Sequence, residues 1–181
     1  MYGASRLRLL CITLCMGILA LGQSIDSWAT QAISETALKA VLLYKIPRFI
    51  YWPAAVSDLK ICVFQEPDFA QALEKLSQQS TGARPIHTLR LTNLADIARC
   101  QLIFIPRKMS AQLGGILKKL ARSRAVTVSD IEGFARAGGM IEFAPKPSGK
   151  GMKILINLPV AKRKKIRFNA QLLRLATILR S

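Results

Sequence analysis

The residues best placed to do chemistry in this sequence are Ser129 and Asp130, which follow a short β-branched run and precede a glycine-bearing turn. A serine nucleophile needs a neighbouring base, and His87 is the single histidine of the chain. His87 falls in a predicted strand, where a structural or exposed role is commoner for a lone histidine. Ser129 and Asp130 also fit a tight corner, because both side chains readily bond nearby backbone N–H groups. We therefore expect a structural corner, with a small-molecule cleft at this point as the alternative.

The sequence offers little for metal or cofactor binding. It contains only 10 Asp and Glu residues, with no D-x-D, E-x-x-E or H-E-x-x-H spacing. Zinc and calcium sites draw on clustered His, Cys or carboxylate ligands, so neither is expected. No P-loop, G-x-S-x-G or dinucleotide-binding fingerprint occurs either. We expect a protein that is not an enzyme and that uses no metal and no cofactor.

The N-terminus has the form of a secretory signal peptide. Two arginines precede an uncharged, mostly apolar run over residues 9–22, which is shorter than the ~20 residues of a spanning helix. Small residues allow cleavage after residue 22 or after residue 29. We assign residues 1–29 to the signal peptide and 30–181 to a single exported domain in the periplasm. A retained N-terminal anchor is the alternative.

Export bears directly on the cysteines. Of the four, Cys11 and Cys15 lie in the signal peptide, so Cys62 and Cys100 remain in the mature chain. Two cysteines in an exported protein usually pair. Each accompanies a strand-like apolar run, and neighbouring strands would bring them within bonding range. A disulfide here would stabilise the fold by about 2–4 kcal/mol; two buried free thiols are the alternative.

Basic residues dominate the charge of the chain. Lys and Arg number 27 against 10 Asp and Glu, which gives a formal net charge of +17. The densest cluster covers residues 162–165 and Arg167, without the interleaved aromatics that a nucleic-acid stacking platform needs. In an exported protein, anionic lipid headgroups are the natural counter-surface. We expect a solvated basic face and no nucleic-acid partner, with attraction to an anionic membrane surface as the second interpretation.

Helical and strand-like patterns alternate along the mature chain. Apolar residues at helical spacing after Ser34 predict a first helix that Pro47 kinks or splits. The tail over residues 172–179 carries an apolar stripe and is also predicted helical. Strand-like runs occur at 59–64, 84–91, 101–105, 125–128, 139–143 and 153–157. The pattern predicts a single α/β domain with a mixed, mostly parallel sheet of about six strands. We expect flanking helices in a Rossmann-like three-layer arrangement, and an antiparallel strand pair at one edge.

Five ordered blocks of the mature chain resemble the YfiR family of periplasmic proteins. The first is KAVLLYK followed by FIYWP, and the others are ICV, CQLIFI, VSD…GFA…GGMI, and INL…A with QLL…LA. The match at Cys62 and Cys100 supports the disulfide. Two departures stand out, because Pro47 replaces a helix-compatible residue and Lys164-Lys165 replace a small residue or glycine.

The resemblance implies a non-enzymatic regulator. Family members of known role bind the periplasmic sensor portion of an inner-membrane diguanylate cyclase and hold it inactive, which restrains cyclic di-GMP signalling and biofilm formation. A homodimer is compatible with that role. We expect the contact patch at Met140 and Ile141 with Val160 and Ala161; the alternative places all four side chains in the core. A periplasmic small-molecule-binding module and a basic envelope protein at the membrane surface are the other interpretations.

Overall fold

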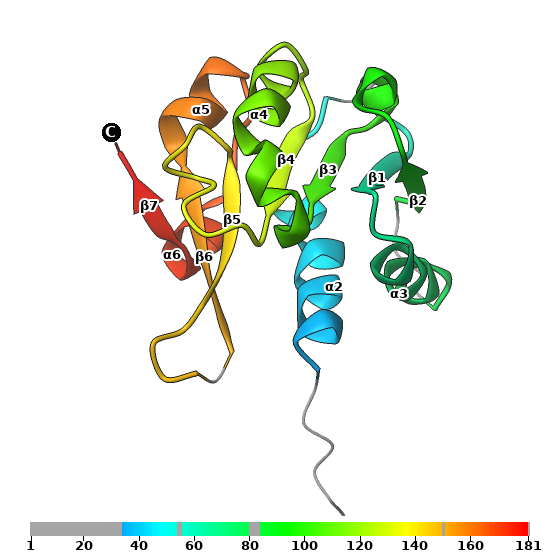
Figure 1. Ribbon diagram of the computed structural model, residues 1–181, viewed down its shortest axis with the longest axis horizontal. Coiled ribbons are helices and arrows are strands. Elements are labelled where there is room, and N and C mark those ends of the chain that lie inside the picture. Colours follow the sequence, from blue (N-terminus) through cyan, green and yellow to red (C-terminus); the bar gives the residue numbers. More distant parts are fainter. Residues whose placement is uncertain (1–33, 54–55, 80–83, 150, 181) are drawn as a thin grey trace, which may run out of the picture. The chain divides into compact units, whose positions relative to one another are not determined.

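The computed structural model describes residues 34–53, 56–79, 84–149 and 151–180. In these ranges, helices cover both faces of a seven-stranded sheet (Figure 1). The predicted signal peptide, and the start of the domain at residue 30, lie outside the described residues. No helix within the described ranges is long and apolar enough to cross a membrane.

The sheet has the strand order β2-β1-β3-β4-β5-β6-β7. Strands β2, β1, β3, β4 and β5 are parallel, whereas β6 runs antiparallel to β5 and parallel to β7. This mixed, mostly parallel sheet confirms the predicted fold class, with one strand more than expected. The strands are β1 (Leu59–Phe64), β2 (Ile86–Leu91), β3 (Leu102–Ile105), β4 (Val126–Ser129), β5 (Ile141–Pro145), β6 (Met152–Asn157) and β7 (Thr177–Leu179).

The helices begin and end at residues suited to those positions. The Ser34 hydroxyl accepts the Ala37 N–H at 3.1 Å and caps the first helix. That helix ends before Pro47, which lies in a following 3₁₀ turn, as expected for a residue without an N–H. The helices are α2 (Glu35–Lys45), α3 (Pro67–Gln78), α4 (Leu113–Ala121), α5 (Leu158–Arg163) and α6 (Ala170–Leu175). The 3₁₀ turns are η1 (Ile46–Phe49), η2 (Leu94–Arg99) and η3 (Arg107–Gln112).

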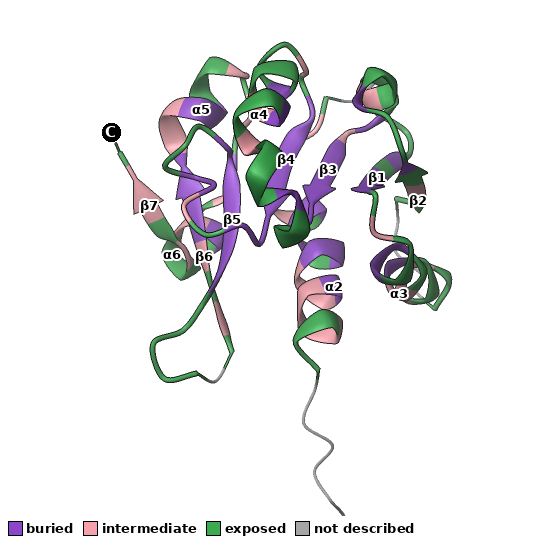
Figure 2. Cartoon of the chain, in the orientation of Figure 1, coloured by how far each residue is buried: buried purple, intermediate pink, exposed green. Residues whose placement is uncertain are grey.

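Among the described residues, the sheet separates two large hydrophobic cores, because successive strand residues face opposite sides. On β1, Ile61 and Val63 belong to the core shared with α2 and α3, whereas Cys62 and Phe64 belong to the core shared with α4 and η2. Buried residues fill the central strands and the inner sides of the helices (Figure 2). The predicted three-layer arrangement is confirmed.

A disulfide joins Cys62 on β1 to Cys100, just before β3, with 5.8 Å between their Cα atoms. Strands β1 and β3 are direct neighbours in the sheet, with Ile61 opposite Leu102. Both cysteines are buried in the core under α4. The pairing expected from export and from the family resemblance is confirmed.

The C-terminal tail differs from the prediction of a helix over residues 172–179. Helix α6 ends at Leu175, and β7 follows, paired with β6. Ala176 has an extended backbone, and the β-branched Thr177 and Ile178 favour a strand. Pairing along β6 satisfies the backbone groups of the tail and overrides its helical spacing. The antiparallel pair β5–β6 therefore lies one strand inside the edge.

Candidate functional site

The corner that follows β4 is built on the side chain of Ser129. This serine is fully buried, and its hydroxyl donates to the Ile105 carbonyl at 2.7 Å and accepts the Ile131 N–H at 2.9 Å. Both bonds tie β3, β4 and the turn together at the backbone. His87 lies on β2, which two strands separate from β4. Ser129 therefore has no imidazole to activate it and acts as a structural residue.

Asp130 belongs to a cluster of charges that fastens α2 to the carboxyl ends of β3 and β4. Its Oδ2 lies 2.6 Å from Lys39 Nζ, which also contacts Glu35 Oε1 at 2.6 Å. Arg107 donates from Nε to the Asp130 carbonyl at 3.2 Å and lies 3.9 Å from Glu35. Because Asp130 is only 6% exposed and already ion-paired, its side chain is not open to a ligand. The alternative of a cleft at Ser129 and Asp130 loses its support.

The same contacts keep this cluster charged. Burial disfavours the ammonium of Lys39, but its hydrogen bonds to Asp130 and Glu35 outweigh burial and raise the pKa of Lys39 above its ordinary 10.5. The hydrogen bond from Lys39, followed by the charge of Lys39, lowers the pKa of Glu35 below its ordinary 4.5. Both groups are ionised across the neutral range, so their ion pair persists throughout it.

Buried polar side chains hold the glycine-bearing loop that follows Asp130. Glu142 on β5 is 3% exposed, and its two carboxylate oxygens accept the N–H groups of Gly133 at 3.1 Å and Ala135 at 3.0 Å. Asn157 donates to the Ala135 carbonyl at 2.7 Å. The sequence marks Glu142 only as a single acid inside an apolar strand run, so its role was not predicted. Its carboxylate serves the backbone of the loop, so it is a structural acid.

Phe134 inserts from this loop into the core and is fully buried. Gly138 has a φ of +111°, a conformation that side-chain-bearing residues rarely adopt. A Cβ atom at Gly139 would overlap the Phe134 ring. Glycine is therefore needed at position 138 for the backbone conformation and at position 139 to leave room for the Phe134 ring. Neither requirement involves a ligand.

The four residues expected to form the partner patch lie in the core. Met140, Ile141 and Ala161 are 0% exposed, and Val160 is 4% exposed. Ile141 pairs with strands on both sides, and all four side chains pack in the core under α2 and α3. Sequence order placed these residues near the basic cluster but could not tell the inner face of α5 from its outer face. The expectation of a surface patch is wrong, and the core alternative holds.

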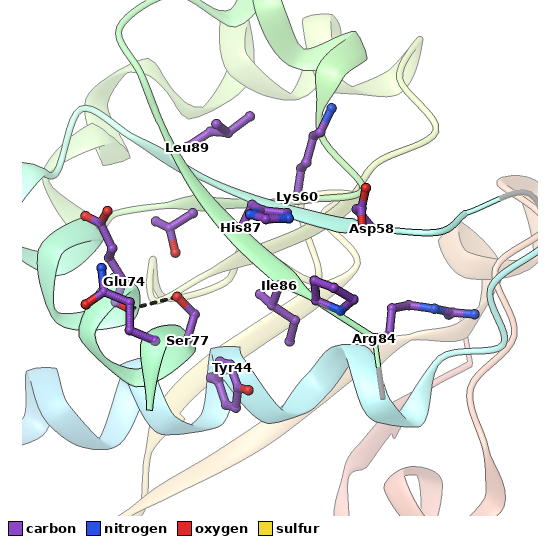
Figure 3. Close-up of a pocket in the computed structure, with 12 residues that line it drawn as sticks. Tyr44, Asp58, Lys60, Glu74, Ser77, Arg84, Ile86, His87 and Leu89 are labelled. Carbon is purple, nitrogen blue, oxygen red and sulfur yellow. Dashed lines mark hydrogen bonds between the residues drawn. The ribbon is translucent and has the colours of Figure 1, made fainter. Parts of the chain in front are cut away.

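The lone histidine lies beside a pocket of about 710 Å³ along edge strand β2 (Figure 3). Other lining side chains include Tyr44 from α2 and Glu74 and Ser77 from α3. The Ser77 hydroxyl donates a hydrogen bond to the Glu74 backbone carbonyl at 2.7 Å. In the described part of the chain, His87 makes no side-chain hydrogen bond, and no group of His, Cys, Asp or Glu could hold a metal ion. The pocket offers no pairing of nucleophile and base.

A large apolar side chain is exposed where α6 leads into β7. Leu175 is 72% exposed, although it is a large apolar side chain. Strand β7 follows at the edge of the sheet (Figure 1). At the far end of β7 from Leu175, Leu158 and Pro159 of α5 line a hollow of about 370 Å³ together with Lys162 and Arg180. We call Leu175, β7, Leu158 and Pro159 the β7 surface. This surface was not foreseen, because the sequence pattern predicted a helix through residue 179 and no strand at β7.

The sequence was compared with models of known protein families. Residues 36–177 match the model of the family described as YfiR/HmsC-like. The chain belongs to the YfiR/HmsC-like family. Members of this family are periplasmic regulators of diguanylate cyclases and are generally not enzymes. The resemblance seen in the five sequence blocks is confirmed. A comparison with curated protein sequences gave no match.

Solved structures share the fold of this YfiR/HmsC-like chain at low identity. A conserved domain protein from Vibrio cholerae has a TM-score of 0.54 and 14% identity, over 81% of this chain and 60% of that one. An ABC domain from Streptococcus pneumonia in complex with L-Trp has a TM-score of 0.52 and 14% identity, over 80% and 60%. The ligand-free, open substrate-binding protein CD0873 from Clostridium difficile has a TM-score of 0.52 and 9% identity, over 77% and 58%. At 9–14% identity, these likenesses concern the fold alone, and the chain spans no more than 60% of the length of each structure.

Proposed function

We propose that this protein is a periplasmic regulator that binds the periplasmic sensor portion of an inner-membrane diguanylate cyclase and holds the cyclase inactive. The observation that carries the proposal is the family match across residues 36–177. The Cys62–Cys100 disulfide supports an oxidising compartment. Inhibition of the cyclase lowers cyclic di-GMP and restrains biofilm formation. A homodimeric regulator is part of the proposal.

The β7 surface is the contact that we propose for the sensor portion. Strand β7 pairs with β6 on one side, and its other side has no strand partner among the described residues. A free strand edge can add an extended segment of a partner, with backbone hydrogen bonds supplying affinity. Exposed apolar side chains next to such an edge serve as anchors. Leu175 is the anchor that this surface offers.

A deletion strain provides the test. Removing the gene raises cellular cyclic di-GMP, and the wild-type gene restores the original level. Leu175→Glu places a charge at the anchor and fails to restore it, whereas the protein remains folded because the side chain is exposed. Gln71→Glu adds the same charge at an exposed position of α3, away from the β7 surface, and restores the level. An unchanged cyclic di-GMP level in the deletion strain rejects the proposed function, and restoration by Leu175→Glu rejects the contact surface.

A further inference from the structure

A cavity of about 920 Å³ opens at the amino ends of β3 and β4, opposite the Ser-Asp corner. Its lining comes from the residues before these strands, the end of α4, the segment that follows α5, and the stretch around Trp52. Figure 1 shows α5 and the end of α4 close together at the top of the view. We call this cavity the basic hollow. Its basic side chains are Arg122, Arg124, Arg163, Lys164, Lys165 and Arg167.

The positive charge of the basic hollow is not neutralised within the described ranges. None of its lining residues is an Asp or Glu. The ion pairs of the described residues use four other cations, at Lys39, Arg90, Arg107 and Lys108. Cations gathered in a concave site focus the positive potential toward solvent and attract anions. The hollow therefore has the electrostatics of an anion-binding surface.

One of the six cations serves the fold. The Lys164 ammonium donates to the carbonyl oxygens of Leu120, at 2.7 Å, and Ser123. Burial lowers the pKa of Lys164. A cation on the last carbonyls of a helix caps it, so Lys164 ties the segment after α5 to the end of α4. Lys165 then turns the chain with a φ of +58°, in the left-handed region. The other five cations remain available for an anion.

An aromatic side chain stands at the rim of the hollow. Tyr51 is 59% exposed, and the Arg167 guanidinium carbon lies 5.4 Å from its ring centroid. The Tyr51 N–H donates to the Arg167 carbonyl at 3.0 Å, which fixes the two residues side by side. Exposed tyrosine beside basic groups is the combination found where proteins meet the headgroup region of a bilayer.

We propose that the basic hollow docks this protein on a membrane surface that carries anionic phospholipids, with a headgroup phosphate held between the arginines. Guanidinium groups match phosphate oxygens in a two-bond geometry. Each basic residue at an anionic surface strengthens binding about fivefold. A concave site can seat a headgroup, whereas diffuse attraction by the net charge has no preferred face. The inference does not depend on the proposed function, because the membrane itself is the partner.

Vesicle sedimentation tests the proposal with the protein isolated from the periplasm of the producing cell. Vesicles contain phosphatidylethanolamine alone or with phosphatidylglycerol, and no protein. The wild type binds only the vesicles with phosphatidylglycerol. Replacing Arg122, Arg124 and Arg163 together by glutamine weakens that binding about 100-fold. None of these three side chains makes an ion pair in the described part of the chain, so the variant keeps the wild-type melting temperature.

A matched control removes the same charge elsewhere. Lys75, Arg136 and Lys153 are exposed and lie outside the hollow, and their combined replacement by glutamine costs less than about 10-fold in binding. Equal losses for the two triple variants overturn the proposal, because net charge would then explain binding. A second arm adds inorganic phosphate alone. A rise in melting temperature with phosphate, in a protein that does not bind the vesicles, assigns the hollow to a soluble anion and overturns the membrane proposal.

Discussion

Charged side chains are paired at the carboxyl ends of the parallel strands and, among the described residues, are left without carboxylate partners at the amino ends. At the carboxyl ends, Lys39 is paired with Asp130 and Glu35, and Lys108 contacts Glu66 at 2.7 Å. At the amino ends, the basic hollow gathers six cations with no carboxylate among its described lining residues. Charges that find their partners inside the protein stabilise the fold. Apart from Lys164, which binds backbone carbonyls, the cations of the hollow make no ion pair among the described residues and are free to bind an anion outside the protein.

The largest effect is expected at the carboxyl ends. Lys39→Met leaves the buried Asp130 carboxylate without its cation, which costs about 3–5 kcal/mol of unfolding free energy. Urea denaturation at pH 7 measures the loss. Combining Lys39→Met with Asp130→Asn removes the uncompensated charge and recovers part of the stability.

At the amino ends, Arg124→Gln changes the unfolding free energy by less than about 0.5 kcal/mol. Similar losses for Lys39→Met and Arg124→Gln would break the comparison between the two ends.

The pH dependence of this cluster sharpens the same contrast. Because folding lowers the pKa of Glu35, its interaction with Lys39 stabilises the fold fully above pH 4.5. This stabilisation is lost as the pH falls through the folded-state pKa of Glu35. Because folding raises the pKa of Lys39, its interactions with Asp130 and Glu35 stabilise the fold fully below pH 10.5. This stabilisation is lost as the pH rises through the folded-state pKa of Lys39. The stability difference between wild type and the Lys39→Met/Asp130→Asn double variant, which carries neither charge of the buried pair, is therefore constant between roughly pH 5 and pH 10 and shrinks outside that window. A difference that drifts steadily from pH 6 to 9 in urea titrations would contradict the assignment.

The smallest effect is expected at the amino ends, with the opposite sign. Lys165 has a φ of +58°, which costs about 1 kcal/mol for a residue with a side chain. Lys165→Gly relieves that strain and raises the unfolding free energy by about 0.5–1 kcal/mol after the entropy of the unfolded glycine is counted. The same change removes one cation from the hollow and weakens vesicle binding about fivefold. Thermal melts and vesicle sedimentation on one sample check both outcomes; a variant that loses stability contradicts the strain assignment.

Sequence patterns predicted what depends on neighbours along the chain. The apolar runs gave the positions of β1, β3 and β4, because strands buried on both faces read as continuous apolar stretches. Export and strand adjacency predicted the Cys62–Cys100 disulfide. The Ser-Asp corner followed from the local bonding habits of Ser129 and Asp130. The prediction of a helical tail was wrong because the structure of residues 177–179 depends on pairing with β6, which lies far from α6 in the sequence.

The site was less predictable, because it depends on which face an element presents. Val160 lies inside α5 and is buried, while Lys162 two residues later is exposed. A six-residue helix is too short for its spacing to reveal the buried side. The sequence identified the basic run that begins at the end of α5, but not that it lies beside Arg122 and Arg124. Those arginines join it only when α4 ends beside α5, a contact that no local pattern encodes.

Regulation of a diguanylate cyclase is the central claim, and cyclase activity in solubilised membranes tests it most directly. Membranes from the deletion strain are dissolved in mild detergent and supplied with GTP, and the rate of cyclic di-GMP formation is followed as the purified protein is added. The rate is expected to fall to a plateau with the wild type and with Gln71→Glu, and to stay high with Leu175→Glu. A rate that stays unchanged at every concentration of the wild-type protein would contradict the account.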